Sequence, residues 1–282
     1  MICINQINHP FEESNQLHLR FFQSFMLFLA TIFDTYTFTG VQWMLILVAA
    51  IITGMSKAGI NTISIISISI WASILDSKSS TGMVLPMLIL ADIMAVWYYK
   101  RRALWSHLIR LMPWVMAGVI LATLCGQSID DQLFKRLMAL IILISLIALF
   151  WWDRKPHTPI PTHPLFASSM GLATGFTSMI GNLAGGFSNV YFVSMRLTKD
   201  HFIGTVAWLF FMLNLFKLPF HIWVWKTVSM QSFLFNLALI PFIAIGFWLG
   251  LRLLSRLNEV GFKQMILWLT TISSLLVLLD LR

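Results

Sequence analysis

Charged residues are scarce in this chain of 282 residues: Asp, Glu, Lys and Arg make up 11%, against about 25% in an ordinary soluble domain. A soluble fold of this size needs far more charge to cover its surface. The deficit therefore excludes a soluble enzyme, a disordered protein and a nucleic-acid-binding domain, despite the formal net charge of +8.

Sites for metal or nucleophilic chemistry are also lacking. Cys3 and Cys125 show neither metal-ligand spacing nor a disulfide framework. The sequence contains no His-rich metal motif and no nucleophile elbow. We therefore expect no metal, no cofactor and no enzymatic activity.

Apolar residues are abundant instead, at 58% of the chain, which predicts an all-α polytopic membrane protein. The surplus of Lys and Arg then reports membrane topology. The apolar segments run at about 41–57, 60–75, 80–99, 107–126 and 133–152, and again at about 164–180, 183–197, 202–224, 233–252 and 263–280.

Four regions follow from these segments: an N-terminal region (1–40), a first transmembrane repeat (41–152), a proline-rich cytoplasmic connector (153–163) and a second repeat (164–282). Residues 1–18 are polar and lack the basic start of a signal peptide, so we expect no removable leader. The apolar stretch at 19–38 either spans the membrane or lies in its interface. We favour a spanning helix, because about 20 apolar residues suffice.

The two repeats share a pattern of matching residues. In each, two short segments meet at a junction rich in Gly, Ser and Thr. An offset of 121 aligns these junctions, and offsets of 122 and 128 extend the match. The aligned pairs are Gly54 with Gly175, Ser56 with Thr177, Asn61 with Asn182, Gly82 with Gly204, Asp92 with Asn214, Pro113 with Pro241 and Gly118 with Gly246.

Basic residues indicate that the second repeat is inverted. If each short pair enters and leaves on one side as a broken, re-entrant hairpin, three further crossings per repeat turn the second repeat upside down. Loop 100–102 is strongly basic and belongs in the cytoplasm by the positive-inside rule, whereas its mate near Lys226 carries one Lys and falls outside. With the N-terminal segment as an extra helix, this completes the predicted fold.

Inverted repeats with matching broken segments are typical of transporters, whose substrate sites lie where the breaks meet near the midplane. Backbone groups freed at a break must line a cavity or be buried in protein. Helix N-termini at a break also attract anions.

Three ionisable residues, Lys57, Asp92 and Lys217, lie deep in apolar sequence, where a charge is costly and usually functional. Either lysine could contact an anionic substrate. The alternative is a structural ion pair between Asp92 and one lysine, with the other lysine snorkelling. Asp92 is also a candidate for proton coupling.

Polar neighbours complete the candidate substrate site. Asn61 and Asn182 could bind a ligand or cap freed backbone groups, and Asn214 shares a helix face with Lys217. We expect His201 and His221 at the membrane interface. The candidate substrate-binding residues are Ser56, Lys57, Asn61, Thr177, Ser178, Asn182, Asn214 and Lys217. Two lysines against one acid favour a small oxyanion such as sulfite, sulfonate, carboxylate or phosphate.

Residues 41–280 resemble the sulfite exporter TauE/SafE family. The first half carries the resemblance in segment 53–59, Leu85-Pro86 and Ala91-Asp92, and the second half in segments 175–186, 202–205 and 214–217. The resemblance implies a multi-pass permease of the bacterial inner membrane that exports sulfite or an organosulfonate such as sulfoacetate. A passive anion channel and a permease for carboxylate, thiosulfate or phosphate remain alternatives. The expected partners are the small anion and the lipid bilayer, with no nucleic acid, and a homodimer stays open.

Overall fold

The computed structural model describes residues 36–75, 77–126 and 163–258, with scattered positions in 130–147 and 260–268. These residues form helices and turns, with no strand among them. The chain divides into a compact unit that ends at Val41 and a second unit that begins at Gln42. The predicted segment at 263–280, most of 133–152 and nearly all of 19–38 lie outside the described residues.

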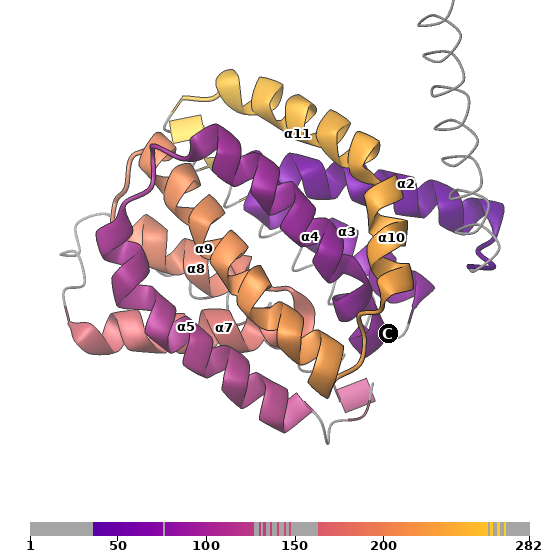
Figure 1. Ribbon diagram of the computed structural model, residues 1–282. Helices are drawn as coiled ribbons and strands as arrows, with labels where there is room; N and C mark the ends of the chain where they lie inside the picture. Colours follow the sequence, from indigo (N-terminus) through magenta and orange to yellow (C-terminus); the bar gives the residue numbers. More distant parts are fainter. Residues whose placement is uncertain are drawn as a thin grey trace, which may run out of the picture. The chain divides into compact units, whose positions relative to one another are not determined.

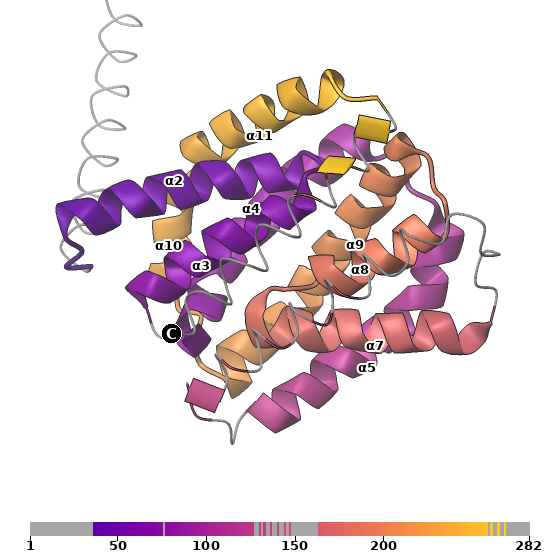
Figure 2. The same cartoon turned by 180° about the vertical axis from the view of Figure 1, so that it is seen from behind.

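The first half opens with a broken pair of helices. The chain turns at Gly59, whose φ of +127° is a conformation that other residues rarely adopt. The Ser67 hydroxyl lies 2.8 Å from the Thr53 hydroxyl and donates to the Ala49 carbonyl at 3.0 Å, so the second helix runs back beside the first (Figure 2). The elements of this half are α2 (Gly40–Lys57), the 3-10 turn η1 (Asn61–Ile63), α3 (Ser64–Ile74), α4 (Ser77–Tyr99) and α5 (Trp105–Gly126).

The second half also opens with a broken pair. Its first helix ends at Gly181, and the C-cap residue Asn182 has a φ of 57°, in the left-handed region that asparagine tolerates. The next helix doubles back, so that the ring of Tyr191 stacks on that of Phe166 with centroids 6.0 Å apart. The elements are α7 (Pro164–Gly181), α8 (Gly185–Ser194), α9 (Lys199–Pro219), the π-helical turn η2 (Phe220–Val224), α10 (Met230–Ala238) and α11 (Ile240–Ser255).

Four of the described helices are long and apolar enough to cross a membrane: α2, α4, α5 and α9 with its continuation η2. The pair α10–α11 makes a fifth span if taken as one. The sequence predicted a single segment at 233–252, but the pair bends by 53°. Pro241 lies in the first turn of α11 and has no N–H with which to continue the hydrogen bonds of α10, which explains the break.

Large apolar side chains on the outer faces of these helices are exposed. Trp97 on α4, Ile109 and Leu124 on α5, and Trp223 on η2 are each more than 60% exposed. Apolar surface of this extent is suited to lipid rather than to water.

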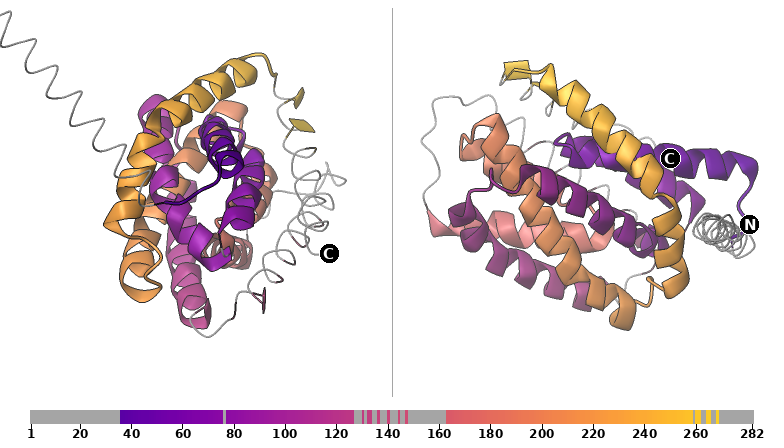
Figure 3. Two further views of the ribbon diagram at one scale, coloured as in Figure 1. Left: turned by 90° about the vertical axis from the view of Figure 1, so that its right-hand side faces the viewer. Right: turned by 45° about the horizontal axis from the view of Figure 1, so that its top comes forward.

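Helices α4 and α9 pack side by side (Figure 1, Figure 3). Arg102, just after α4, forms a 2.8 Å ion pair with Asp200 at the start of α9. At the other end, Gly82 near the start of α4 lies directly against Thr227, which follows η2. The two helices are therefore antiparallel. They are also the two that the offset of 122 relates to each other.

Glycines bring two further helix pairs into close contact. At each of four glycines, a Cβ atom would collide with a carbonyl oxygen of the partner helix. Small residues of this kind are typical of helix contacts in membranes. Each pair joins one helix of the first half to one of the second. The contacts are Gly175 with Val115 and Gly118 with Leu172 between α7 and α5, and Gly54 with Ile243 and Gly246 with Ile51 between α2 and α11.

Two lysines occupy equivalent places at opposite ends of the central helices. Lys78, at the start of α4, donates to the carbonyl of Gly126 at the end of α5, at 2.7 Å. Lys199, at the start of α9, donates to the carbonyls of Leu254 and Leu257 at the end of α11, at 2.8 and 2.6 Å. A cation at a helix C-terminus is stabilising, because the terminal carbonyls carry partial negative charge.

Candidate functional site

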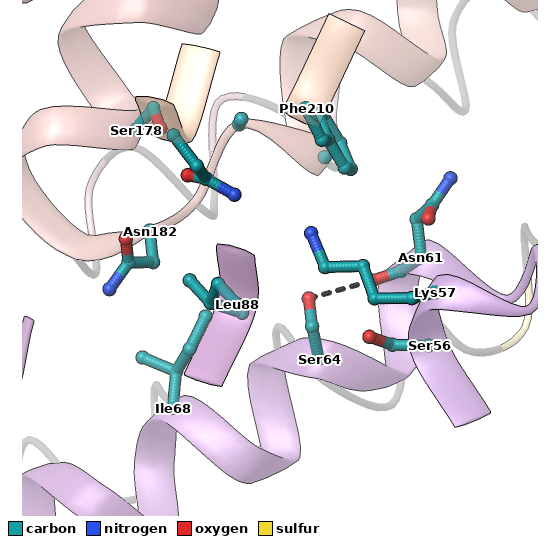
Figure 4. A pocket seen from close by; sticks show the side chains of 12 residues that line it. Ser56, Lys57, Asn61, Ser64, Ile68, Leu88, Ser178, Asn182 and Phe210 are labelled. Atoms are coloured by element: carbon teal, nitrogen blue, oxygen red, sulfur yellow. Dashed lines mark hydrogen bonds between the residues drawn. The ribbon is translucent and has the colours of Figure 1, made fainter. Parts of the chain in front are cut away.

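Lys57 ends α2 and points from the first break into the space between the helices (Figure 4). Its side chain is buried, and its ammonium lies 2.8 Å from Oδ1 of Asp92. The ammonium also lies 4.7 Å from the centroid of the Phe210 ring, a cation–π distance. This lysine therefore connects α2 with both central helices.

Asp92 lies in the middle of α4 and is fully buried. Its Oδ2 accepts a hydrogen bond from Nδ2 of Asn214 on α9, at 2.6 Å. The sequence left open whether Asp92 pairs with a lysine, and the structure pairs it with Lys57. The carboxylate is thus held by a hydrogen bond at Oδ2 and by an ion pair at Oδ1, which together offset the cost of burying its charge.

Lys217, on α9, is fully buried at the second break. It donates to the carbonyl of Ser178 at 3.0 Å and to Oδ1 of Asn182 at 2.6 Å. The alternative that the unpaired lysine snorkels is therefore wrong for Lys217. Nδ2 of Asn182 in turn donates to the carbonyl of Thr81 on α4, at 3.1 Å. Asn182 thus serves the protein framework, which is one of the two roles left open for it.

A cavity of about 20 Å³ lies between the two breaks, and this is enough for a water molecule. Figure 4 shows Lys57, Asn61 and Ser64 of the first break across this cavity from Ser178 and Asn182 of the second. The complete lining is Ser56, Lys57, Asn61, Ser64, Ile68, Leu88, Ser178, Asn182, Ala184, Gly185, Phe210 and Asn214.

Six of the eight substrate-binding candidates thus line one cavity. Lys217 lies behind the lining and acts on it through Ser178 and Asn182. Thr177 is the exception, because its hydroxyl donates to the carbonyls of Thr174 and Leu183 in its own broken pair.

Sequence reasoning missed the apolar wall of the cavity, which Ile68, Leu88 and Phe210 form. Nothing distinguishes these side chains from the many apolar residues around them in the sequence. It also did not predict that His221, expected at the membrane interface, is fully buried in the protein. The helical spacing from Asn214 through Lys217 to His221 was the available signal.

At each break, the end of the helix before it and the start of the helix after it differ in their hydrogen-bond partners. At the carbonyl ends of α2 and α7, the Tyr99 hydroxyl donates to Ala58 at 2.7 Å and Lys217 donates to Ser178. At the amide ends of α3 and α8, the N-cap side chains of Ile63 and Ala184 form no capping hydrogen bond, and Ala184 and Gly185 of the second break line the cavity. With two lysines and one aspartate, the site carries a formal charge of +1. A helix N-terminus without a side-chain cap and a net positive charge both favour an anion.

Residues 45–277 match the family described as sulfite exporter TauE/SafE. The chain belongs to this family. This agrees with the resemblance found in the sequence, and with the apolar helices it makes the chain an integral, multi-pass membrane protein of a transporter family. The membership is consistent with the prediction that the chain is not an enzyme. No curated protein and no solved structure matches the chain.

Proposed function

We propose that the protein exports a small sulfur-containing anion, sulfite or an organosulfonate such as sulfoacetate, across the bacterial inner membrane by alternating access. One observation carries the proposal: in a chain of the sulfite exporter family, the two breaks meet at a buried cavity with a surplus positive charge.

The chemistry of the lining suits such a substrate. Sulfite and sulfonates present several oxygen acceptors around one negative charge or two. The ammonium of Lys57, the amide of Asn61 and the open amide end of α8 supply donors on the polar side. Charge-assisted hydrogen bonds of this kind are the strong ones. The apolar side chains of the wall match the chemistry of a carbon substituent on sulfur.

Three contact patterns support inverted repeats around this site. Helices α4 and α9, related by the offset of 122, run antiparallel. The glycine contacts between α5 and α7 have counterparts between α11 and α2. The offset of 128 relates α5 to α11, and the offset of 121 relates α2 to α7. The offset of 121 also aligns Lys78 with Lys199. These lysines cap the ends of α5 and α11, which the offset of 128 aligns. Inverted repeats supply the two equivalent arrangements that alternating access needs.

The membrane potential suits export. The loop at Arg102 lies at the strongly basic end and is placed in the cytoplasm by the positive-inside rule. A cell that is negative inside drives each negative charge outward by about 2.3 kcal/mol per 100 mV. An added coupling ion is therefore optional for export.

Asp92 offers one such coupling. A proton on its carboxyl group would end the ion pair with Lys57 and release the ammonium toward the cavity. Proton binding and anion binding would then favour each other, because both compete with the same contact.

The test is transport by the purified protein in liposomes, with labelled sulfite, sulfoacetate, taurine, sulfate and phosphate. Wild type should move sulfite or a sulfonate fastest, and Lys57→Ala and Lys217→Ala should each lower that flux at least tenfold, since each removes a charge-assisted hydrogen bond. Arg252→Ala, at the far end of α11, is the control. If neither lysine variant changes any flux, the site is wrong.

A passive anion channel is the alternative from another class. A cavity of about 20 Å³ fits an occluded carrier better than an open pore. Currents that reverse at the anion equilibrium potential in planar bilayers would favour the channel. Preference for carboxylate, thiosulfate or phosphate in the liposome panel would keep the carrier and change its substrate.

A further inference from the structure

His221 is a buried histidine outside the central cavity. Its side chain is fully buried, and Nδ1 lies 2.8 Å from the hydroxyl of Thr227. Its other nitrogen, Nε2, has no hydrogen-bond partner among the described residues. A buried polar atom without a partner costs about 1–3 kcal/mol, so it calls for an explanation.

The π-helical turn η2 fixes this side chain. The N–H of Trp225 donates to the carbonyl of Phe220 at 2.9 Å, the five-residue spacing of a π-helix. The carbonyl of His221 accepts from the N–H groups of Thr227 and Val228. The rings of His221 and Trp225 meet edge to face at 5.2 Å. Turns of this type are frequent at functional sites.

His221 lies one helical turn beyond Lys217, on the face of α9 that also carries Asn214. Lysines surround this region: Lys217 on α9 and Lys78 on α4, whose ammonium lies over the Trp225 ring at 5.2 Å. Asp92 on α4 is already held by Lys57 and Asn214. Charge here therefore favours an anion.

A chain of contacts ties this region to the central cavity. Lys217 binds Asn182, which lines the cavity, and Asn182 donates to the carbonyl of Thr81. The next residue, Gly82, lies against Thr227, the partner of His221. His221 thus lies in a polar layer between the cavity and the end of α9 that is assigned to the outside.

We propose that Lys217 and His221 form a second oxyanion site, one helical turn beyond the central cavity, which receives the substrate on its way out. When Nδ1 accepts from Thr227, Nε2 carries the hydrogen and donates to an oxyanion oxygen. Lys217, one helical turn earlier on the same face, supplies the positive charge. This inference rests on the proposed function and deepens it, because it identifies a residue that binds the substrate along the exit path.

Two near-isosteric substitutions separate the roles of the ring nitrogens. His221→Asn keeps an amide at the position of Nδ1 and removes the group at Nε2. His221→Gln places an amide at the position of Nε2 and gives up the group at Nδ1. The assay follows labelled sulfite that starts on the cytoplasmic side of the protein and is exported across the liposome membrane. Flux is measured over a range of sulfite concentrations, which gives the maximal flux and the half-saturating concentration.

We expect His221→Asn to lower maximal flux about tenfold, with a half-saturating concentration near that of wild type, whereas His221→Gln stays within about threefold. Lys57→Ala should instead raise the half-saturating concentration. The reverse order, with the Gln variant impaired and the Asn variant normal, would mean that the contact with Thr227 matters and would overturn the proposal. Normal flux in both variants would also overturn it.

Calorimetric titration with sulfite, sulfate and phosphate tests the second site independently of transport. Wild type and His221→Gln should bind two anions, and His221→Asn one. One binding event in wild type with all three anions refutes the second site, even if liposomes transport sulfite. Two events in wild type without any sulfite flux would keep the second site and refute the proposed export.

Discussion

The ammonium of Lys57 is shared between a carboxylate, an aromatic ring and a cavity. Asp92 holds it at 2.8 Å, while Phe210 covers it and the cavity opens beside it. A buried ion pair adds little net stability, because desolvation offsets most of its attraction, but removing one partner leaves an expensive unpaired charge. An arriving anion and Asp92 therefore compete for the same cation.

This competition predicts how transport depends on pH. In wild type, flux should rise as pH falls, because a proton on Asp92 releases Lys57 for the anion. In Asp92→Asn, Lys57 is free at every pH, so flux should no longer vary with pH. The probe is isethionate, whose sulfonate stays ionised under mildly acidic and mildly alkaline conditions, so that only the protein titrates.

Asn214→Ala serves as the matched control for that measurement. It removes the other hydrogen bond to the same carboxylate but leaves the titrating group in place, so its flux should still change with pH. If Asp92→Asn keeps the wild-type pH dependence, the proton binds elsewhere.

Single residues differ in how far the sequence predicts them. Lys57, Asp92 and Lys217 are evident because charge is rare in apolar sequence. Which lysine pairs with Asp92 depends on how α2, α4 and α9 pack, and no local pattern encodes that. The burial of His221 was not predicted either, because the residue lies near the end of an apolar segment, where we expected the membrane interface. The residues 225–228 fold against it and bury it instead.

The breaks are the helical elements that the sequence predicts best. Gly59 needs a backbone conformation that favours glycine, and Asn182 one that favours glycine or asparagine, so the residues themselves mark the turns. The bend between α10 and α11 was missed although Pro241 signals it. Its repeat mate, Pro113, lies inside the continuous helix α5, so proline alone does not decide.

Glycine contacts between helices lead to a stability prediction. Gly175→Ala places a methyl group against the carbonyl of Val115, so α7 and α5 must move apart. Overpacking of this kind costs about 1–3 kcal/mol. We expect a lower melting temperature in detergent and a lower yield of folded protein.

Gly40→Ala is the control for this variant, because a Cβ at Gly40 has nothing within 4 Å. It should be neutral or slightly stabilising, since alanine favours helix over glycine. Equal melting temperatures for the two variants would show that the contact of α7 with α5 tolerates a methyl group.

For the whole molecule, inverted repeats predict that equivalent loops lie on opposite sides of the membrane. Arg101→Cys marks the loop after α4, and Met230→Cys marks the equivalent region after α9; both native side chains are exposed. In a background with Cys3→Ser and Cys125→Ser, a membrane-impermeant maleimide added to intact cells should label position 230 but not 101.

Permeabilised cells provide the control, because both cysteines should then react. Labelling of both positions in intact cells, or of neither, would mean parallel repeats. Labelling of 101 alone would keep the inversion and reverse the orientation assigned from the basic loops.

The two halves place their lysines differently. The first half carries its lysine at the break and an acid on its long helix, whereas the second half has Ser178 at the position aligned with Lys57 and carries its lysine on the long helix. Two copies of the first half would bring together two lysines and two acids, and the centre would be neutral. Two copies of the second half would bring together two lysines and no acid. Only the unlike pair leaves a single unit of positive charge. Under the proposed inverted repeats, this charge comes from the positions at which the two halves differ.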